Sequence, residues 1–337
     1  MFAADHAGQD TGRNRAHDAE RCTRHQDRRA LTVLAEQIFL TSSTSEGYSH
    51  IFRLMCNPKE IVLFPRPSYP LFQFLVDLHD LISAFYPLRL QEQWGIHFAS
   101  LEYLIKAETR GIVLVNPNNP TGNYLKKFEL EKLNKMCVKE GLFLISDEVF
   151  YDYGRQDDPQ RVSLARNKEV LSFTLSGLSK NLGLPQMKLS WIVVQGPDEL
   201  VKEACARMEV ITDTYLSVNT PVQNAVPEWL QMADQMQSLL KVRVEQNRKI
   251  LGENMADTKH CQLLPSEGGW YAVLSLNTSK PEEEVVMECL TRDHVQVHPG
   301  YFFDFEEGRH IVVSLLPETM KFQEGIKKVL KRIKPKS

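Results

Sequence analysis

Short apolar runs alternate with longer amphipathic stretches along almost the whole chain, and this alternation is what most constrains the fold. An apolar run bounded by polar or turn residues is typical of a buried strand, whereas apolar residues three or four positions apart are typical of a covering helix. The pattern predicts an α/β protein in which βαβ units build a mainly parallel sheet between layers of helices. The clearest strands are expected at residues 61–64, 111–115, 142–145 and 171–175.

Two stretches show helical spacing. Between residues 130 and 137 apolar side chains recur at this spacing among lysines and glutamates, as in a helix that crosses over the sheet. Core packing accounts fully for that stripe. A longer helical tract is expected from about Asn224 to Asn254, and a second region of strands and helices follows it.

The domain organisation follows from these elements. We expect a three-layer large domain over residues 31–235 and a smaller C-terminal α/β domain over residues 236–337, with the boundary inside the long helical tract. Residues 1–30 are rich in Asp, Arg, His and Gln and poor in large apolar side chains. We therefore expect a poorly ordered leader there.

Charge and cysteine content narrow the functional classes. The 337 residues carry a formal net charge of −3, which provides no broad basic surface for nucleic acid or acidic membranes. No apolar run approaches the roughly 20 residues that span a bilayer, and the start does not resemble a signal peptide. The six cysteines lack CxxC spacing, which favours reduced thiols over disulfides or a metal site. We expect a cytoplasmic protein that acts on small molecules and holds no metal.

Polar residues follow the predicted strands, at the edge of the sheet where open parallel α/β proteins bind ligands. The strand that ends at Val115 runs into the sequence NPNNPTG, from Asn116 to Gly122, which holds Asn119 in a turn. An Asn-Pro or Thr-Gly turn by itself often does no more than close a loop. The complete seven-residue run is a much more specific sign of a functional site.

The next predicted strand delivers Asp147, within the sequence SDEVF. A carboxylate at the end of a buried apolar run is costly unless a cation faces it. The structural alternative is a helix N-cap. Asp147 is therefore either a capping residue or one member of a charged site.

The following strand leads to the sequence SGLSK, which ends at Lys180, and then to LPQMK, which ends at Lys188. A lysine amine becomes nucleophilic when burial or a neighbouring cation lowers its pKa, and this pair of lysines offers both conditions. The alternative is that Lys180 is an ordinary solvated lysine.

These motifs, in this order and spacing, are similar to the large domain of the class I/II aminotransferases, fold-type I enzymes that use pyridoxal 5'-phosphate (PLP). The resemblance is joined by TSSTSEG at residues 41–47, PRPSYP at 65–70 and PSEGGWY at 265–271, and it covers about residue 31 to the C-terminus. It implies a transaminase that uses PLP to move an amino group between an L-amino acid and a 2-oxo acid.

The resemblance also implies a role for each matching residue. Lys180 would form the Schiff base with PLP and, once substrate displaces it, would move the proton as a general acid and base. Asp147 would pair with the pyridinium nitrogen and keep the ring an electron sink. Asn119 would hydrogen-bond the ring hydroxyl oxygen, and Tyr69 would stack on the ring.

The cofactor phosphate is assigned, by the same resemblance, to a helix start and two neighbouring segments. Ser43 and Thr44 would bind it through hydroxyls and backbone N–H groups at the helix N-terminus. Lys188 and a hydroxyl from Ser176 or Ser179 would complete this site. A simple capping run is the alternative for the two N-terminal residues.

The chain departs from the family pattern at three places. Lys188 stands where an arginine is usual, so the phosphate would meet a point charge in place of a guanidinium fork. Phe150 stands where many members have a tyrosine that contacts the ring hydroxyl, and Tyr151 would face the other side of an extended backbone. A valine in the sequence VVSLL replaces the arginine that usually holds the substrate carboxylate. Arg309, three residues earlier, is our candidate substitute, although it needs a bulge to face the site.

Two further expectations come from the way the family assembles its site. Residues 214–221 are similar to a segment that approaches the cofactor across a dimer interface, so we expect a homodimer. The family usually carries some tens of residues more before the phosphate-binding run. We therefore expect either that the polar leader is a truncated or mis-started remnant of the N-terminal arm, or that the protein works without the lid that the arm provides over the substrate.

Three functional readings stay open. The first is a transaminase with a ping-pong cycle. The second keeps the fold and the cofactor but makes the chain a lyase, decarboxylase or racemase, because the same carbanion can partition in several ways. The third is a catalytically impaired PLP-binding homologue, which the departures from the pattern favour. Substrate assays separate the first two readings, and PLP binding without transamination identifies the third.

Overall fold

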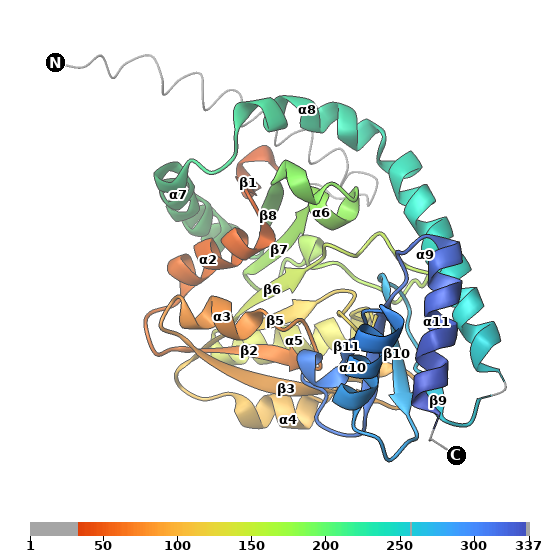
Figure 1. The fold of residues 1–337 in the computed structure, drawn as a ribbon. Coiled ribbons are helices and arrows are strands. Elements are labelled where there is room, and N and C mark those ends of the chain that lie inside the picture. Colours follow the sequence, from red (N-terminus) through yellow and green to blue (C-terminus); the bar gives the residue numbers. More distant parts are fainter. Residues whose placement is uncertain (1–32, 257, 335–337) are drawn as a thin grey trace.

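The computed structural model describes residues 33–256 and 258–334 of the chain, which form two β-sheets and their covering helices (Figure 1). The leader expected at residues 1–30 lies outside the described residues. One sheet has eight strands in the order β1-β8-β7-β6-β5-β2-β3-β4, and the other has four in the order β11-β12-β10-β9. None of the helices in the described part of the chain is long and apolar enough to cross a membrane.

The eight-stranded sheet and its helices occupy the chain up to Gln231. Its strands are β1 (Ile38–Thr41), β2 (Ile61–Arg66), β3 (Ile82–Leu90), β4 (Trp94–Ile96), β5 (Thr109–Val115), β6 (Phe143–Asp147), β7 (Ser172–Gly177) and β8 (Ser190–Gln195). The helices around it are η1 (Ala35–Gln37), α2 (Thr44–Met55), α3 (Phe72–Asp77), α4 (Phe98–Leu104), α5 (Lys127–Glu140), η2 (Leu164–Arg166), α6 (Leu178–Asn181), η3 (Pro185–Met187), α7 (Asp198–Tyr215) and α8 (Thr220–Gln231).

The expected mainly parallel sheet is confirmed. Strands β2, β3, β5, β6 and β7 pair in parallel along the sheet, while β8 and β4 are antiparallel to their neighbours. The predicted strands at 61–64, 111–115, 142–145 and 171–175 coincide with β2, β5, β6 and β7 to within two residues at each end, and the predicted crossover helix is part of α5.

Successive side chains of the buried strands point to opposite faces of this sheet, and each face packs against its own set of helices. Val62 and Phe64 of β2 pack into one apolar cluster with residues of α2, α3 and α7. Leu63, between them, packs into another cluster with residues of α4 and α5. Ile145 and Leu144 of β6 divide in the same way. Because successive side chains of a strand point to opposite faces, continuous apolar runs here produce a sheet that is buried on both sides.

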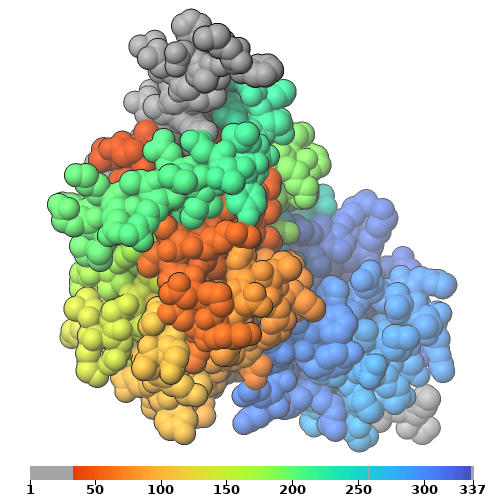
Figure 2. Space-filling view, turned by 90° about the vertical axis from the view of Figure 1, so that its left-hand side faces the viewer, coloured from red at the N-terminus to blue at the C-terminus, as the bar shows by residue number. Residues whose placement is uncertain are grey.

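The second sheet lies beside the first, against a long helix (Figure 1). It is built from β9 (Cys261–Leu263), β10 (Tyr271–Leu276), β11 (His298–Pro299) and β12 (His310–Ser314), with α9 (Ala233–Met255), α10 (Glu282–Asp293), η4 (Gly300–Phe303) and α11 (Thr319–Ile333) around it. Figure 2 shows the C-terminal segments, coloured blue, lying directly against the orange N-terminal ones. The backbone hydrogen bond from Ser68 N to Phe303 O, 2.9 Å long, is one of the links between the two parts.

The helical tract expected from about Asn224 to Asn254 is confirmed, but a break within it was not expected. The structure has two helices, α8 and α9, which divide at Met232. The side chain of Asn219 accepts a hydrogen bond from Val222 N and starts α8 before the expected residue. At Met232 the backbone N–H bonds to Trp229 O, three residues back, which is the tighter 3₁₀ pattern that often ends an α-helix. The position of a domain boundary at residue 235 stays a prediction.

A glycine permits a close approach between the two parts of the chain. Gly122, the last residue of NPNNPTG, has φ +74°, a left-handed conformation that other residues adopt only with strain. A Cβ atom there would lie 2.1 Å from Ser266 Oγ and 2.5 Å from Gly268 O. The carbonyl of Gly122 also accepts a hydrogen bond from Glu267 N. The loop after β5 therefore contacts the loop before β10 backbone to backbone.

We predict that Gly122→Ala lowers the free energy of unfolding by about 2–4 kcal/mol, because it adds backbone strain and a steric clash. The matched control is Gly252→Ala in α9, where an added Cβ meets nothing within 4 Å. The free energy of unfolding of that variant should rise by about 0.5–1 kcal/mol, because alanine has a higher helix propensity than glycine. Urea unfolding of the two variants measures both values. A Gly122 variant as stable as the native chain would contradict this description of the contact.

Candidate active site

The carboxyl ends of the central strands lie in register at one edge of the large sheet. Val115 of β5, Asp147 of β6 and Leu175 of β7 are Cα partners across the three parallel strands. Backbone bonds continue the alignment, since Asn116 N donates to Asp147 O and Glu148 N donates to Leu175 O, each at 2.8 Å. The residues that follow these strands are thus brought together where parallel sheets bind ligands.

Asp147 is a buried carboxylate that, within the described part of the chain, accepts hydrogen bonds from neutral groups only. Its residue is 9% exposed, and its carboxylate accepts from Tyr48 Oη at 3.4 Å and from Val149 N at 3.3 Å. Burial raises the pKa of Asp147 to about 6, although these two hydrogen bonds and the charge of Lys180 act in the opposite direction. A cation placed against this carboxylate would relieve much of its desolvation. The alternative of an N-cap does not apply, because no helix begins at Asp147.

Lys180 lies on the short helix α6, directly after β7. It is half-buried, and burial lowers the pKa of its amine while the charge of Asp147 partly opposes that shift. The Nζ atom faces two aromatic rings, with 6.0 Å to the ring centre of Phe150 and 5.8 Å to that of Trp270. Lys180 makes no hydrogen bond or ion pair with any residue in 33–256 or 258–334. It is therefore not an ordinary solvated lysine.

The short helix that carries Lys180 is held from several sides. Tyr153 Oη donates to Asn181 O at 2.9 Å, and Asn181 Nδ2 donates to Asp152 Oδ2 at 2.6 Å. Gln237 of α9 donates to Asn181 Oδ1 at 3.0 Å. A four-residue helix has little stability of its own, so these bonds fix the orientation of Lys180.

Two polar side chains at the same edge are buried without partners. Asn119 is 7% exposed and Ser176 is 4% exposed, yet Asn119 Oδ1 and Ser176 Oγ bond to nothing in the described residues. Buried polar atoms are nearly always hydrogen-bonded, and exceptions often mark a ligand site. Together with the carboxylate of Asp147 and the amine of Lys180, they fit a ligand that has a ring nitrogen, an aldehyde, a hydroxyl and a phosphate, as PLP does.

The predicted phosphate residues come from three neighbouring strands. Thr41, Ser190 and Gly177 are Cα partners across β1, β8 and β7, which places the start of α2 beside the end of β7. Ser43 caps α2, accepting from Glu46 N at 3.1 Å, and Thr44 is the first residue of that helix. Ser43 therefore does act as a helix cap.

Lys188 and Ser176 complete this group. Lys188 is exposed, lies two residues before Ser190 and has φ 50°, and Ser176 is the Cα partner of Trp191. The structure thus brings Ser43, Thr44, Ser176 and Lys188 to one corner of the site.

Tyr69 lies in the loop after β2 and faces the same edge. It is 40% exposed. Burial, followed by the charge of Asp147 and then the nearby Tyr271, raises the pKa of its hydroxyl. The ring of Tyr69 meets Phe72 edge-on at 6.1 Å, which fixes one side of it.

Arg309 is not brought to this site. Its guanidinium donates to Thr278 O at 2.9 Å, and this contact is on the exposed side of the second sheet. Residue 310 pairs with Ser275, whereas the end of β12 near Trp270 is Ser314, about 13 Å further along the strand. Val312, at the register where the family has an arginine, is fully buried in an apolar cluster.

Phe150 and Tyr151, which follow β6, point to opposite sides of the backbone. Phe150 is 4% exposed and packs edge-on against Trp270 with ring centres 5.2 Å apart, on the side of Lys180. The ring of Tyr151 instead packs against Tyr124 at 5.5 Å. Phe150 therefore contributes an apolar wall beside the amine of Lys180 and no hydrogen bond.

Two important residues were missed by the sequence reading. Tyr48, in the first half of α2, is the only side chain in the described residues that donates to Asp147, and it is 2% exposed. Asn118 ties the loop after β5 to the loop after β2, since it accepts from Ser68 Oγ and donates to Pro67 O, both at 2.9 Å. The helical period could place Tyr48 in the core, but its partner depends on tertiary packing.

The segment at residues 214–221 lies next to the start of α2. Ser217 Oγ donates to Glu46 Oε1, and Glu46 also accepts from Ser42 N. Leu216, in the same segment, is 74% exposed. The segment therefore joins the predicted phosphate corner to an exposed apolar surface.

Comparison with known proteins gives a consistent result. The family model for aminotransferase class I and II matches residues 14–321. A glutamate-pyruvate aminotransferase of Escherichia coli is 24% identical over 311 residues, which are 90% of this chain and 76% of that protein. An S-alkyl-thiohydroximate lyase of Arabidopsis thaliana is 29% identical over 202 residues, 59% of this chain and 44% of the lyase.

Solved structures share the fold. An alanine aminotransferase from Pyrococcus furiosus superposes with a TM-score of 0.85 at 22% identity, covering 94% of this chain and 81% of that one. An aminotransferase from Escherichia coli gives a TM-score of 0.83 at 23% identity, covering 94% and 80%. The fold-type I architecture expected from the sequence is therefore confirmed.

We predict that Asp147→Asn stabilises the cofactor-free protein by up to about 3 kcal/mol at pH 8, and by progressively less as the pH falls. A raised carboxyl pKa means that ionisation is more costly in the folded chain than in the unfolded one. This cost is absent below the ordinary Asp pKa and complete above the folded pKa of about 6. Asp157→Asn, at an exposed carboxylate, is the control and should change little at any pH. Urea unfolding from pH 4 to 8 measures the difference, and an Asp147 variant that is less stable at pH 8 would contradict it.

Proposed function

The chain belongs to the aminotransferase class I and II family, and we propose that Lys180, Asp147 and Asn119 are the centre of its active site. It is a PLP-dependent aminotransferase, whose substrates are amino acids and 2-oxo acids. The observation that carries the site proposal is the unpaired, half-buried amine of Lys180 beside the buried carboxylate of Asp147. No other lysine of the described chain combines burial, a lowered pKa and a carboxylate neighbour in this way.

When bound, PLP supplies an electron-withdrawing ring that stabilises negative charge on the α-carbon of the substrate. Asp147 would face the ring nitrogen and keep it protonated, and the new cation would in turn hold the carboxylate ionised. Tyr48 would orient the carboxylate through its hydrogen bond. Asn119, whose side chain makes no bond in the described residues, would bond the ring hydroxyl oxygen.

Lys180 would attach the cofactor and later move the proton. Its lowered pKa leaves a larger fraction of the amine neutral at a given pH, and only a neutral amine can act as a nucleophile or accept a proton. The rings of Phe150 and Trp270 beside Nζ exclude water from that side. General acid–base catalysis of this kind works best when the pKa of the group is near the working pH.

Ser43, Thr44, Ser176 and Lys188 would hold the phosphate. The start of α2 presents backbone N–H groups and the positive end of a helix dipole, which favour an anion. The unpaired hydroxyl of Ser176 and the charge of Lys188 approach from β7 and β8. Tyr69 would cover the exposed face of the cofactor ring.

We further propose that the chain forms a homodimer and acts in the cytoplasm. Val210 of α7 is 68% exposed, and Leu216, whose neighbour Ser217 bonds to Glu46 of α2, is 74% exposed. A groove of about 960 Å³ between η1, β1, α7 and residues 216–224 adjoins them. Exposed apolar groups beside a groove are typical of a surface that a partner covers. The free cysteines in the described residues agree with a reducing compartment.

We predict that Lys180→Ala abolishes the visible absorption of protein-bound PLP and lowers transamination by about 10²- to 10⁴-fold or more. Lys135→Ala, at an exposed lysine of α5, is the matched control and should behave as the native protein. Turnover of an amino-acid mixture is followed with and without pyruvate and 2-oxoglutarate. Transamination requires the oxo acid, whereas a lyase would release product without it. Normal absorption in the Lys180 variant would show that another residue binds the cofactor.

We predict that Leu216→Asp converts a dimer into a monomer, because a charge on the covered face would be desolvated. Asp tolerates the left-handed backbone of residue 216, which has φ 51°, so the fold should survive. Leu239→Asp on α9, at a side chain that is 69% exposed, is the control. Sedimentation velocity measures the mass of each protein. A native protein that sediments as a monomer, or a dimer in both variants, would contradict the proposal.

A further inference from the structure

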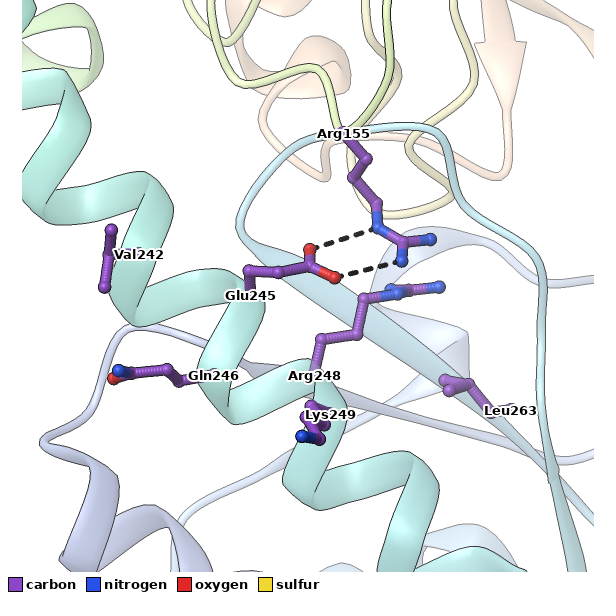
Figure 3. A pocket seen from close by; sticks show the side chains of 7 residues that line it. All are labelled: Arg155, Val242, Glu245, Gln246, Arg248, Lys249 and Leu263. Carbon is purple, nitrogen blue, oxygen red and sulfur yellow. Dashed lines mark hydrogen bonds and ion pairs between the residues drawn. The ribbon is translucent and has the colours of Figure 1, made fainter.

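A second charged site lies away from the candidate active site, where the segment after β6 meets α9 and β9. Figure 3 shows a cavity there, of about 650 Å³, with Arg155, Arg248 and Lys249 among the residues that line it. Arg155 comes from the segment after β6, while Arg248 and Lys249 come from α9. The cavity therefore joins the two parts of the chain.

Arg248 is the unusual member of this group. It is only 8% exposed, yet it makes no hydrogen bond or ion pair with any residue in 33–256 or 258–334. Its neighbour Asn247, by contrast, donates to Leu315 O and Pro317 O. Burial, followed by the charge of Arg155, lowers the pKa of Arg248 to about 10. Arg248 is largely buried, lines the pocket and has no protein partner among the described residues, so a ligand that supplies negative charge in the pocket would stabilise its guanidinium.

The charges around Arg248 do not satisfy it from within the chain. Glu245 is three residues earlier on α9 and close enough to reach it. In the structure, however, the Glu245 carboxylate points to Arg155, with both of its oxygens 3.3 Å from guanidinium nitrogens (Figure 3). The Nζ atom of Lys249 lies 3.9 Å from Oε1 of Glu253, one turn further along the helix. Three cations thus border the cavity against the single carboxylate of Glu245.

We propose that this cavity binds the phosphate group of a small phosphate monoester, with Arg248 and Arg155 as its main ligands. Two guanidinium groups offer planar pairs of N–H donors, which suit the several oxygens of a phosphate dianion. The cavity is larger than a phosphate alone needs, and Val242 and Leu263 give it apolar walls for an organic group. The site is separate from the predicted phosphate corner, and the inference does not depend on the proposed active site.

Binding there would connect the two sheets of the protein. Arg155 already holds the loop before β10, since its backbone N–H donates to Glu267 O and its guanidinium donates to Ser266 O. The same loop leads to Trp270, whose ring lies 5.8 Å from Lys180 Nζ. A ligand shared by Arg155 and Arg248 would therefore fix α9 relative to a loop that reaches the candidate active site.

The test is isothermal titration of the PLP-loaded protein, freed of excess PLP, with phenyl phosphate in a phosphate-free buffer of low ionic strength. Inorganic phosphate and phenol are the comparison probes. We expect saturable binding of phenyl phosphate, weaker binding of inorganic phosphate, and none of phenol. Added salt should weaken the binding, because the attraction is between charges.

Four variants make the assignment specific. Arg248→Met should lower the affinity for phenyl phosphate at least tenfold, and Arg155→Met, at an exposed residue, should lower it too if the first variant folds poorly. Glu245→Gln should raise the affinity several-fold, because it removes the competing carboxylate. Arg207→Met, at an exposed arginine of α7 that pairs with Glu203, is the matched control and should leave affinity unchanged.

Thermal unfolding provides a second readout. Without ligand, Arg248→Met should melt at the same temperature as the native protein or higher, since it removes an unpaired buried cation. A purely structural arginine would instead leave the variant less stable. Binding that is unsaturable, that ignores Arg248→Met, or that falls equally in Arg207→Met would overturn the proposal. Equal affinity for inorganic phosphate and phenyl phosphate would overturn the assignment to a monoester.

Discussion

Asp147 lies at the end of a central strand and is 9% exposed, and among the described residues its carboxylate is bonded only by Tyr48 and by the backbone of Val149. Two neutral donors do not compensate for taking a charge out of water, and so the pKa of this carboxyl is raised to about 6. Much of the surrounding structure can be understood from this incompletely satisfied charge. It calls for a cation on its open side, and the half-buried amine of Lys180 and the ring nitrogen of PLP are the groups that can provide one.

The positions of the other site residues depend on the sheet. Parallel strands deliver their carboxyl ends to one edge, and the register of Val115, Asp147 and Leu175 brings three loops together there. The loops are then held by bonds outside the site itself. Asn118 connects the loop after β5 to the loop after β2, and Asn181 anchors the short helix that carries Lys180. Fixed loops around a buried charge are what allow a site to be ready before its ligand arrives.

The two charged sites of the molecule contrast with each other. In the first, the proposed active site, the charge of Lys180 acts on the buried carboxylate of Asp147, and the family to which the chain belongs uses PLP. In the second, the largely buried Arg248 has no partner among residues 33–256 and 258–334, while Glu245 is engaged by Arg155. Both cases follow from the same physical rule, that a buried ion without a counter-ion is unfavourable. They differ in sign, and so the ligands that they favour differ as well.

The fold class, the order of the strands along the chain and the positions of Asn119, Asp147 and Lys180 at or after strand ends could all be predicted from the sequence, because local hydrophobic period and strand-end chemistry are properties of neighbouring residues. The roles of these three residues stay a proposal. The break at Met232, the hydrogen bond from Tyr48 and the isolation of Arg248 could not. Arg309 is an example of what the sequence could not show. It lies only three residues before VVSLL in the chain, yet its guanidinium bonds to Thr278 O, away from the candidate active site. Which residues meet across 99 positions, as Tyr48 and Asp147 do, is decided by the packing of helices on the sheet. Only the tertiary structure contains that information.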